Sequence, residues 1–190
     1  MKKLITLTVL LLTILQFNSY GQEASTENYG KTLNIGVGLG GHYGYYKYVG
    51  NSIPVLHIDY EIGVAKNFTL APFINIHTHT RHYYWGNNNH PYRNYYYKET
   101  GLAMGAKGTY YFDEILRADS KWDFYLAGSL GFVAVFSRWD SGYYGDRDYY
   151  RRPNPLFLDL HVGAEYHINN RLGLFLDLST GISTFGIAIH

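Results

Sequence analysis

The feature that most constrains this chain is a strict alternation of apolar residues with polar or small ones, repeated in eight separate segments. In one of them Leu56, Ile58 and Tyr60 alternate with His57 and Asp59. A period of two places successive side chains on opposite faces of a strand, so each segment is expected to form a β-strand with one apolar face. The predicted strands cover residues 33–40, 56–65, 74–81, 101–112, 122–136, 156–167, 172–179 and 184–189. The sequence therefore predicts an all-β protein.

Alternation alone does not say which face of the sheet is buried. A soluble barrel of the lipocalin type buries its apolar face, whereas a membrane barrel turns that face toward lipid. In the predicted strands lysine is almost absent, and the polar faces combine glycine with opposite charges, as at Lys107 and Asp59. A narrow lumen needs small residues and paired charges, because eight strands leave only enough room for side chains. This pattern favours an eight-stranded antiparallel up-and-down transmembrane β-barrel.

The connections between the predicted strands alternate in length. Short turns are expected at residues 66–67 and 169–171, and long loops at 41–52, 82–97 and 137–155. Aromatic residues crowd the strand ends, as at Trp122 and Tyr166, where interfacial girdles are expected. Short turns at one end and long loops at the other are typical of outer-membrane barrels.

The first residues have the pattern of a cleavable signal peptide. Lys2 and Lys3 precede an apolar run over residues 4–15, and small residues end the segment ahead of Gln22. We expect a signal peptide over residues 1–21, a short segment over 22–30 and the barrel over 31–190. The chain has no cysteine and a formal net charge of only +1, so it has neither a disulfide framework nor the basic excess of nucleic-acid-binding proteins.

The mature chain resembles, over nearly its whole length, the eight-stranded outer-membrane barrels of the OmpA and OmpX type. It is most similar to the small porin-family proteins that consist of an outer membrane protein beta-barrel domain. Gly186 and Ile189 have the spacing of that family's assembly signal, whose terminal aromatic residue would fall one position after His190. The resemblance implies a monomer in the outer membrane of a Gram-negative bacterium. Its expected partners are membrane lipid, lipopolysaccharide and the outer-membrane assembly machinery.

Three groups of residues are candidate sites. A polar lumen network is expected from His57, Asp59, Glu61, His77, His79, Arg81, Lys107, Asp159, His161, Glu165 and Asp177. A surface ligand or glycan is expected on the long loops, where tyrosine, tryptophan and arginine suit adaptable recognition, with Tyr45, Tyr46, Tyr84, Trp85, Tyr96, Trp139, Tyr144, Arg147 and Arg151 as candidates. Pairing the second and third strands about Asn67 would place His57 opposite His77 with His79 nearby, a set that suits zinc or copper. No cofactor is expected.

These observations favour a structural or surface-interaction role through tyrosine-rich extracellular loops. A soluble periplasmic lipocalin-like ligand-binding barrel is the first alternative, in which Leu56, Ile58, Leu158 and Leu160 would line an apolar cavity. An outer-membrane lipid-modifying enzyme is the second. No nucleophile-elbow motif accompanies the serines of the chain, so no catalytic residue is assigned.

Overall fold

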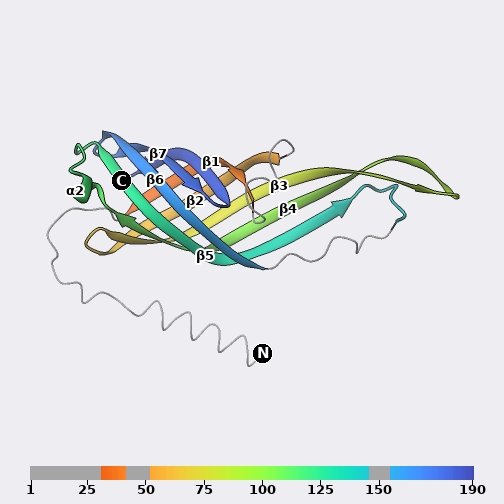
Figure 1. Cartoon of the computed structure of the whole chain (residues 1–190), viewed down its shortest axis with the longest axis horizontal. Helices are drawn as coiled ribbons and strands as arrows, with labels where there is room; N and C mark the ends of the chain where they lie inside the picture. The colour runs from red at the N-terminus through yellow and green to blue at the C-terminus, as the bar shows by residue number, and fades with distance from the viewer. Residues whose placement is uncertain (1–30, 42–51, 146–154) are drawn as a thin grey trace, which may run out of the picture.

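The computed structural model describes residues 31–41, 52–145 and 155–190, and in it eight antiparallel strands close into a barrel (Figure 1). Each strand pairs with its neighbours in sequence, and β1 pairs with β8 to close the ring. The strands are β1 (Thr32–Gly40), β2 (Ser52–Ala65), β3 (Phe68–Asn87), β4 (His90–Tyr111), β5 (Trp122–Trp139), β6 (Leu156–Asn169), β7 (Leu172–Ser179) and β8 (Ile182–Ile189). The predicted eight-stranded up-and-down barrel is confirmed. The signal peptide over residues 1–21 and the segment over 22–30 lie outside the described residues.

The two faces of the barrel wall are apolar outside and polar inside. Leu158 and Leu160 of β6 are 67% and 69% exposed on the outer face, while Asp159 between them is 3% exposed. Leu56 and Ile58 of β2 also point outward, so the lipocalin-like alternative, which needs these leucines around an internal cavity, is wrong. A wall of this kind satisfies its backbone groups between strands and presents side chains suited to lipid, as in a transmembrane β-barrel.

Two of the three turns are short at the end of the barrel where β1 begins and β8 ends. Lys66 and Asn67 join β2 to β3, with Asn67 in the left-handed region (φ 58°) that asparagine tolerates. A one-turn helix, α2 (Asp113–Leu116), lies between β4 and β5 at this same end (Figure 1). No helix in the part of the chain that the structure describes is long and apolar enough to cross a membrane.

The long loop expected over residues 82–97 is wrong, because this segment continues β3 and β4 as a hairpin. The side-chain oxygen Oδ1 of Asn87 closes the turn by accepting the backbone N–H groups of Asn89 and His90, both at 2.9 Å. Aromatic residues occupy both faces of these strand ends, which hides the period of two, yet such residues favour extended backbone. The expected loops over 41–52 and 137–155 fall partly outside the described residues.

The β3–β4 hairpin and the end of β5 extend lengthwise beyond the other strands (Figure 1). Residues 80–98 lie beyond Ser52, where β2 begins, and residues 134–145 lie beyond Leu156, where β6 begins. We call these two stretches the projection. It stands at the barrel end opposite to α2 and the C-terminal residue (Figure 1).

Two rows of residues cross the inner wall, each with a pair of glycines between two rings. Phe73, Gly105, Gly131 and Phe157 are register partners on β3 to β6, and the two phenylalanine rings meet above the glycines with centroids 5.6 Å apart. His57, Gly36, Gly186 and Phe175 form the second row, with ring centroids 6.3 Å apart. In the second row a Cβ atom at Gly36 would lie 2.8 Å from Cζ of Phe175, so this glycine leaves room for the ring. Phe73 and Phe157 of the first row belong to a buried apolar cluster with Val55, Ala103, Val133 and Ile182.

Candidate functional site

A buried ion-pair network occupies the lumen around Lys107 of β4. The Lys107 Nζ atom lies 2.7 Å from Asp59 Oδ2, 3.7 Å from Asp177 Oδ2 and 3.9 Å from Glu61 Oε1. The Tyr125 ring, with its centroid 5.9 Å from Nζ, covers the ammonium group from β5. One cation therefore serves three carboxylates from two strands, β2 and β7, which is the paired-charge lining that a narrow lumen needs.

Neutral donors complete the coordination of two of these carboxylates. Glu61 accepts hydrogen bonds from Thr69 Oγ1 (2.6 Å), Tyr111 Oη (2.7 Å) and Asn34 Nδ2 (3.0 Å). Asn34 Nδ2 also donates to Asp59 Oδ1 at 2.8 Å. With these bonds in place, the carboxylate excess is stabilised by dipoles as well as by the single ammonium group.

The predicted pairing of His57 with His77 is wrong by two residues, since His57 lies opposite Asn75. Both His57 ring nitrogens are engaged, Nδ1 with Asn75 Oδ1 (2.6 Å) and Nε2 with Asp59 Oδ2 (2.9 Å). The His77 ring lies against Gly101 on β4, and His79 is in register with Ser52. Among the residues that the structure describes, His57, His77 and His79 do not form a group of metal ligands.

A second series of hydrogen-bonded side chains crosses β5, β6 and β7. His161 Nε2 is hydrogen-bonded to Ser129 Oγ (2.9 Å), and His161 Nδ1 to Asp177 Oδ1 (2.8 Å). This is the hydrogen-bond order of a serine–histidine–aspartate triad. Ser129 is buried, however, and points into the packed lumen rather than toward lipid. Asp177 connects this series of side chains to the ion-pair network around Lys107, so the two form one lumen network.

Asp159 clamps the short connection between β7 and β8. Its two carboxylate oxygens accept hydrogen bonds from the hydroxyls of Ser179 (2.9 Å) and Thr180 (2.7 Å) and from the backbone N–H groups of Gly181 (2.7 Å) and Ile182 (2.9 Å). Four donors on one buried carboxylate explain why this connection is tight although it lies at the end of the barrel where long loops were expected.

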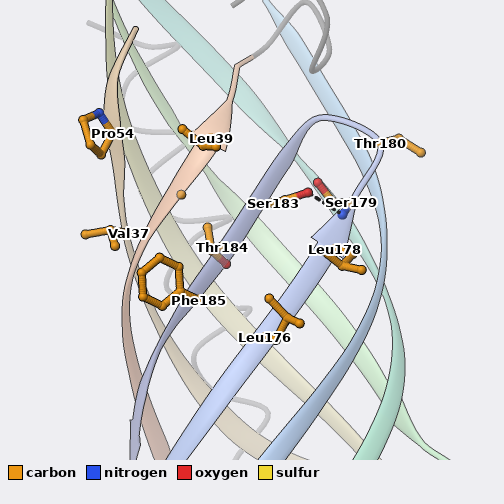
Figure 2. Close-up of a pocket in the computed structure, with 11 residues that line it drawn as sticks. Val37, Leu39, Pro54, Leu176, Leu178, Ser179, Thr180, Ser183, Thr184 and Phe185 are labelled. Carbon is orange, nitrogen blue, oxygen red and sulfur yellow. Dashed lines mark hydrogen bonds between the residues drawn. The ribbon is translucent and has the colours of Figure 1, made fainter. Parts of the chain in front are cut away.

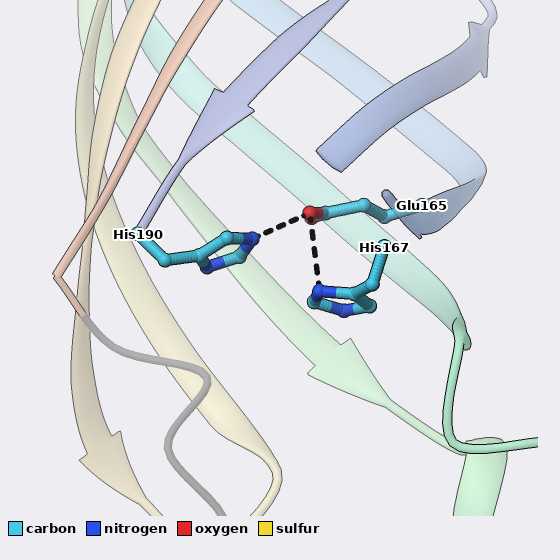
Figure 3. Close-up of side chains that lie close together, drawn as sticks. All are labelled: Glu165, His167 and His190. Carbon is cyan, nitrogen blue, oxygen red and sulfur yellow. Dashed lines mark hydrogen bonds and ion pairs between the residues drawn. The ribbon is translucent and has the colours of Figure 1, made fainter. Parts of the chain in front are cut away.

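A further polar cluster lies near the end of the barrel that carries the short turns, and the sequence did not single it out as a metal site (Figure 3). His190 Nε2 donates a hydrogen bond to Glu165 Oε1 at 2.7 Å, and His167 Nδ1 lies 4.0 Å from the same oxygen. The His167 and His190 rings stack with centroids 4.9 Å apart. The hydrogen bond to the Glu165 carboxylate raises the pKa of His190 above its ordinary value, against the opposing effect of partial burial.

The signal for this cluster is visible only after the strands are paired. His167 and Gly173 are register partners on β6 and β7, and Gly173 and Ala188 are partners on β7 and β8. His190 therefore comes near the β6 residues although β7 runs between the two strands.

The candidate ligand residues of the projection separate onto its two faces. Trp85 and Trp139 lie on the inner face, where Tyr143 packs against both with ring centroids at 5.2 Å and 4.2 Å. Tyr84 and Tyr96 point outward, and Tyr144 stacks on His90 with centroids 4.6 Å apart. The remaining candidates Tyr45, Tyr46, Arg147 and Arg151, and the side chain of Arg81, lie outside the described residues.

A groove of about 860 Å³ indents the outer wall where β1 and β7 end and β8 begins (Figure 2). Its lining is apolar and continues the exposed apolar face of the barrel wall, with side chains from Val37, Leu39, Leu176 and Phe185. At its upper edge the Ser183 hydroxyl accepts a hydrogen bond from the backbone N–H of Ser179 at 3.0 Å.

No family model matches this chain, and no curated protein matches it. Among solved structures, one described as "De novo design of transmembrane beta-barrels" is similar at 14% sequence identity, with a TM-score of 0.47. The alignment covers 86% of this chain and 98% of that one. The assignment of the fold rests on the strand pairing and on the two faces of the wall described above.

Proposed function

We propose that this protein is an outer-membrane β-barrel of a Gram-negative bacterium that binds a surface ligand or glycan through its projection. The observation that carries this function is the projection itself. Its three strands, β3, β4 and β5, continue past the ends of the neighbouring strands and hold aromatic rings beyond the barrel wall. Export by a signal peptide over residues 1–21, a monomeric state and kinship with small barrels of the OmpA and OmpX type belong to the same proposal. Membrane lipid, lipopolysaccharide and the assembly machinery are its further partners.

The filled lumen supports a binding role over a transport role. The Phe73 and Phe157 rings meet across the barrel, and the ion-pair network around Lys107 fills the space toward the short turns. Eight strands enclose just enough room for such side chains. We assign no catalytic function, because the buried Ser129 hydroxyl faces this packed interior.

The outer face of the projection has the chemistry of a recognition surface. Tyr84 and Tyr92 are 65% and 64% exposed, and their rings lie side by side with centroids 5.8 Å apart. Tyrosine provides a rigid apolar ring and a hydroxyl at low conformational cost, which suits contacts with sugars. The cluster around Tyr143 on the inner face holds the hairpin rigid, so the exposed rings are preorganised.

The location is tested by labelling single cysteines, since the chain has none of its own. Asn88→Cys places a thiol on the β3–β4 turn of the projection, and Asn170→Cys places one on the β6–β7 turn at the other end. In intact cells we expect a membrane-impermeant maleimide to label Asn88→Cys and to reach Asn170→Cys only after permeabilisation. Labelling of Asn170→Cys alone, or of neither residue in folded protein, would contradict an outward-facing projection.

Ligand binding is tested on an array of immobilised bacterial and host glycans with the barrel folded in detergent. We expect wild-type protein to bind at least one glycan class and a Tyr84→Ala, Tyr92→Ala variant to lose about tenfold or more in affinity, because two exposed rings each provide about 1 kcal/mol. Tyr110→Ala, an exposed tyrosine near the opposite end, is the matched control and should bind as wild type. A blank array, or equal losses in both variants, would leave the barrel without the proposed recognition role.

A further inference from the structure

We propose that Glu165, His167 and His190 form a binding site for a divalent transition metal ion, with zinc as the best fit. This site goes beyond the surface-binding role and lies at the opposite end of the barrel from the projection. One carboxylate and two imidazoles are a ligand set that zinc accepts, and they leave a fourth position for water. Glu165 and His167 come from β6, and His190 directly follows β8.

The distances between the ligand atoms already approach those of a bound ion. The three atoms all lie within 4.8 Å of one another, with Glu165 Oε1 2.7 Å from His190 Nε2 and 4.0 Å from His167 Nδ1. Two ligands about 2.0 Å from a tetrahedral zinc ion lie about 3.3 Å apart. Changes of about 1.5 Å or less in these distances therefore convert the observed cluster into a coordination sphere, with His190 moving back from Glu165 and His167 moving toward it.

The second nitrogen of each ring is held by an outer partner. His167 Nε2 donates to Asp123 Oδ2 at 2.7 Å, which leaves Nδ1 directed at Glu165 (Figure 3). His190 Nδ1 is hydrogen-bonded to Thr32 Oγ1 at 3.0 Å, which leaves Nε2 directed at the same carboxylate. Metal-binding histidines almost always have such outer partners, which fix the tautomer and the ring orientation.

The barrel wall makes space for the carboxylate at Gly173 of β7. Glu165 on β6 can reach His190 only across β7, and its side chain passes over Gly173. A Cβ atom at Gly173 would overlap Glu165 Oε1, so any other residue there displaces the carboxylate. This glycine is thus a positioning residue for the site.

An ion can enter from solvent, because the side chains of His167 and His190 are 24% and 21% exposed. Glu165 is buried, with its carboxylate oxygen directed at the two rings. A bound ion would link β6 to the end of β8 across β7, next to the seam where β8 pairs with β1. Metal binding should therefore stabilise the closed barrel by mass action.

The test is a titration of untagged barrel, folded in detergent, with zinc in competition with a chromophoric chelator. A pH of about 8 is suitable, because protons compete with the metal for His190. We expect one zinc ion per barrel and a melting temperature that rises with zinc concentration. His167→Gln and His190→Gln should each lower the affinity at least tenfold, and Asp123→Asn, which replaces the outer carboxylate with a neutral amide, about tenfold.

Two further variants separate a metal site from general effects on folding. Gly173→Ala retains every ligand but displaces Glu165, so it should weaken zinc binding. Its fold is checked on a detergent gel, where a closed barrel is expected to change mobility only after boiling, and we expect this heat-dependent gel shift to be retained. His82→Gln removes an exposed histidine of the projection and should bind zinc as wild type. Absence of stoichiometric zinc binding in wild-type protein, or equal losses in His82→Gln and His167→Gln, would overturn the proposal.

Discussion

Replacing Lys107 with methionine is expected to cost about 3–5 kcal/mol of unfolding free energy, the usual cost of removing one partner from a buried ion pair. The substitution keeps the length of the side chain but removes the ammonium group that lies 2.7 Å from Asp59 Oδ2. Asp59, Glu61 and Asp177 would then remain in the lumen without a lysine, with hydroxyl, amide and imidazole groups as their remaining partners. Three unpaired carboxylates in a narrow interior repel one another, so the loss should exceed that of any single hydrogen bond in the network.

Urea unfolding of the barrel in detergent, followed by tryptophan fluorescence, measures this loss. Lys98→Met on the same strand is the matched control, because Lys98 is exposed on the projection, and its unfolding midpoint should stay close to that of wild type. Adding Asp59→Asn to Lys107→Met removes one of the unpaired charges and should recover part of the stability. Equal midpoints for Lys107→Met and Lys98→Met would show that the network contributes nothing to stability.

The direction in which each side chain faces could be predicted from the sequence, because one simple rule determines it. Asp59 and Lys107 each stand between apolar neighbours, so the period of two assigns them to the polar face of their strands. The scarcity of lysine in the strands then indicates that this face is internal. Both inferences use only local pattern and composition, which long-range geometry does not change.

The pairing of particular side chains could not be predicted in the same way. A register shift of two residues keeps every side chain on its face, so the pattern fits His57 opposite His77 as well as opposite Asn75. A register irregularity between Gly63 and Ala65 next to the β2–β3 turn shifts the pairing of these strands. For this reason the predicted histidine site is wrong. The cluster of His167 and His190 could not be predicted either, because it forms only through the pairing of β6, β7 and β8.

The projection was missed for a different reason. Tyr83, Tyr84 and Trp85 follow one another along β3, so the apolar face and the polar face cannot be told apart there. Without a visible alternation, and with three asparagines at residues 87–89, this segment has the sequence pattern of a loop. In the structure alternate aromatic residues still face inward and outward, and the inward ones pack around Tyr143. Where both faces are aromatic, composition is the better guide to strand structure than periodicity.

The second large effect is expected from Gly131→Ala, which should lower the unfolding free energy by about 3 kcal/mol or prevent folding. Gly131 is the register partner of Gly105, and a Cβ atom at Gly131 would overlap the carbonyl oxygen of Met104. The obstacle is backbone of the neighbouring strand, which cannot rotate away as a side chain can. Relief would require the two strands to separate locally, with loss of the hydrogen bonds between them.

Thermal midpoints from the heat-dependent gel shift compare this variant with Gly128→Ala on the same strand. A Cβ atom at Gly128 would meet only Leu160 Cδ2, at 3.8 Å, so this control should be as stable as wild type or slightly more stable. Adding Phe157→Ala to Gly131→Ala enlarges the space in the lumen but leaves the Met104 carbonyl in place. We expect no rescue from it, whereas a recovered midpoint would mean that the glycine serves only to make room for the ring.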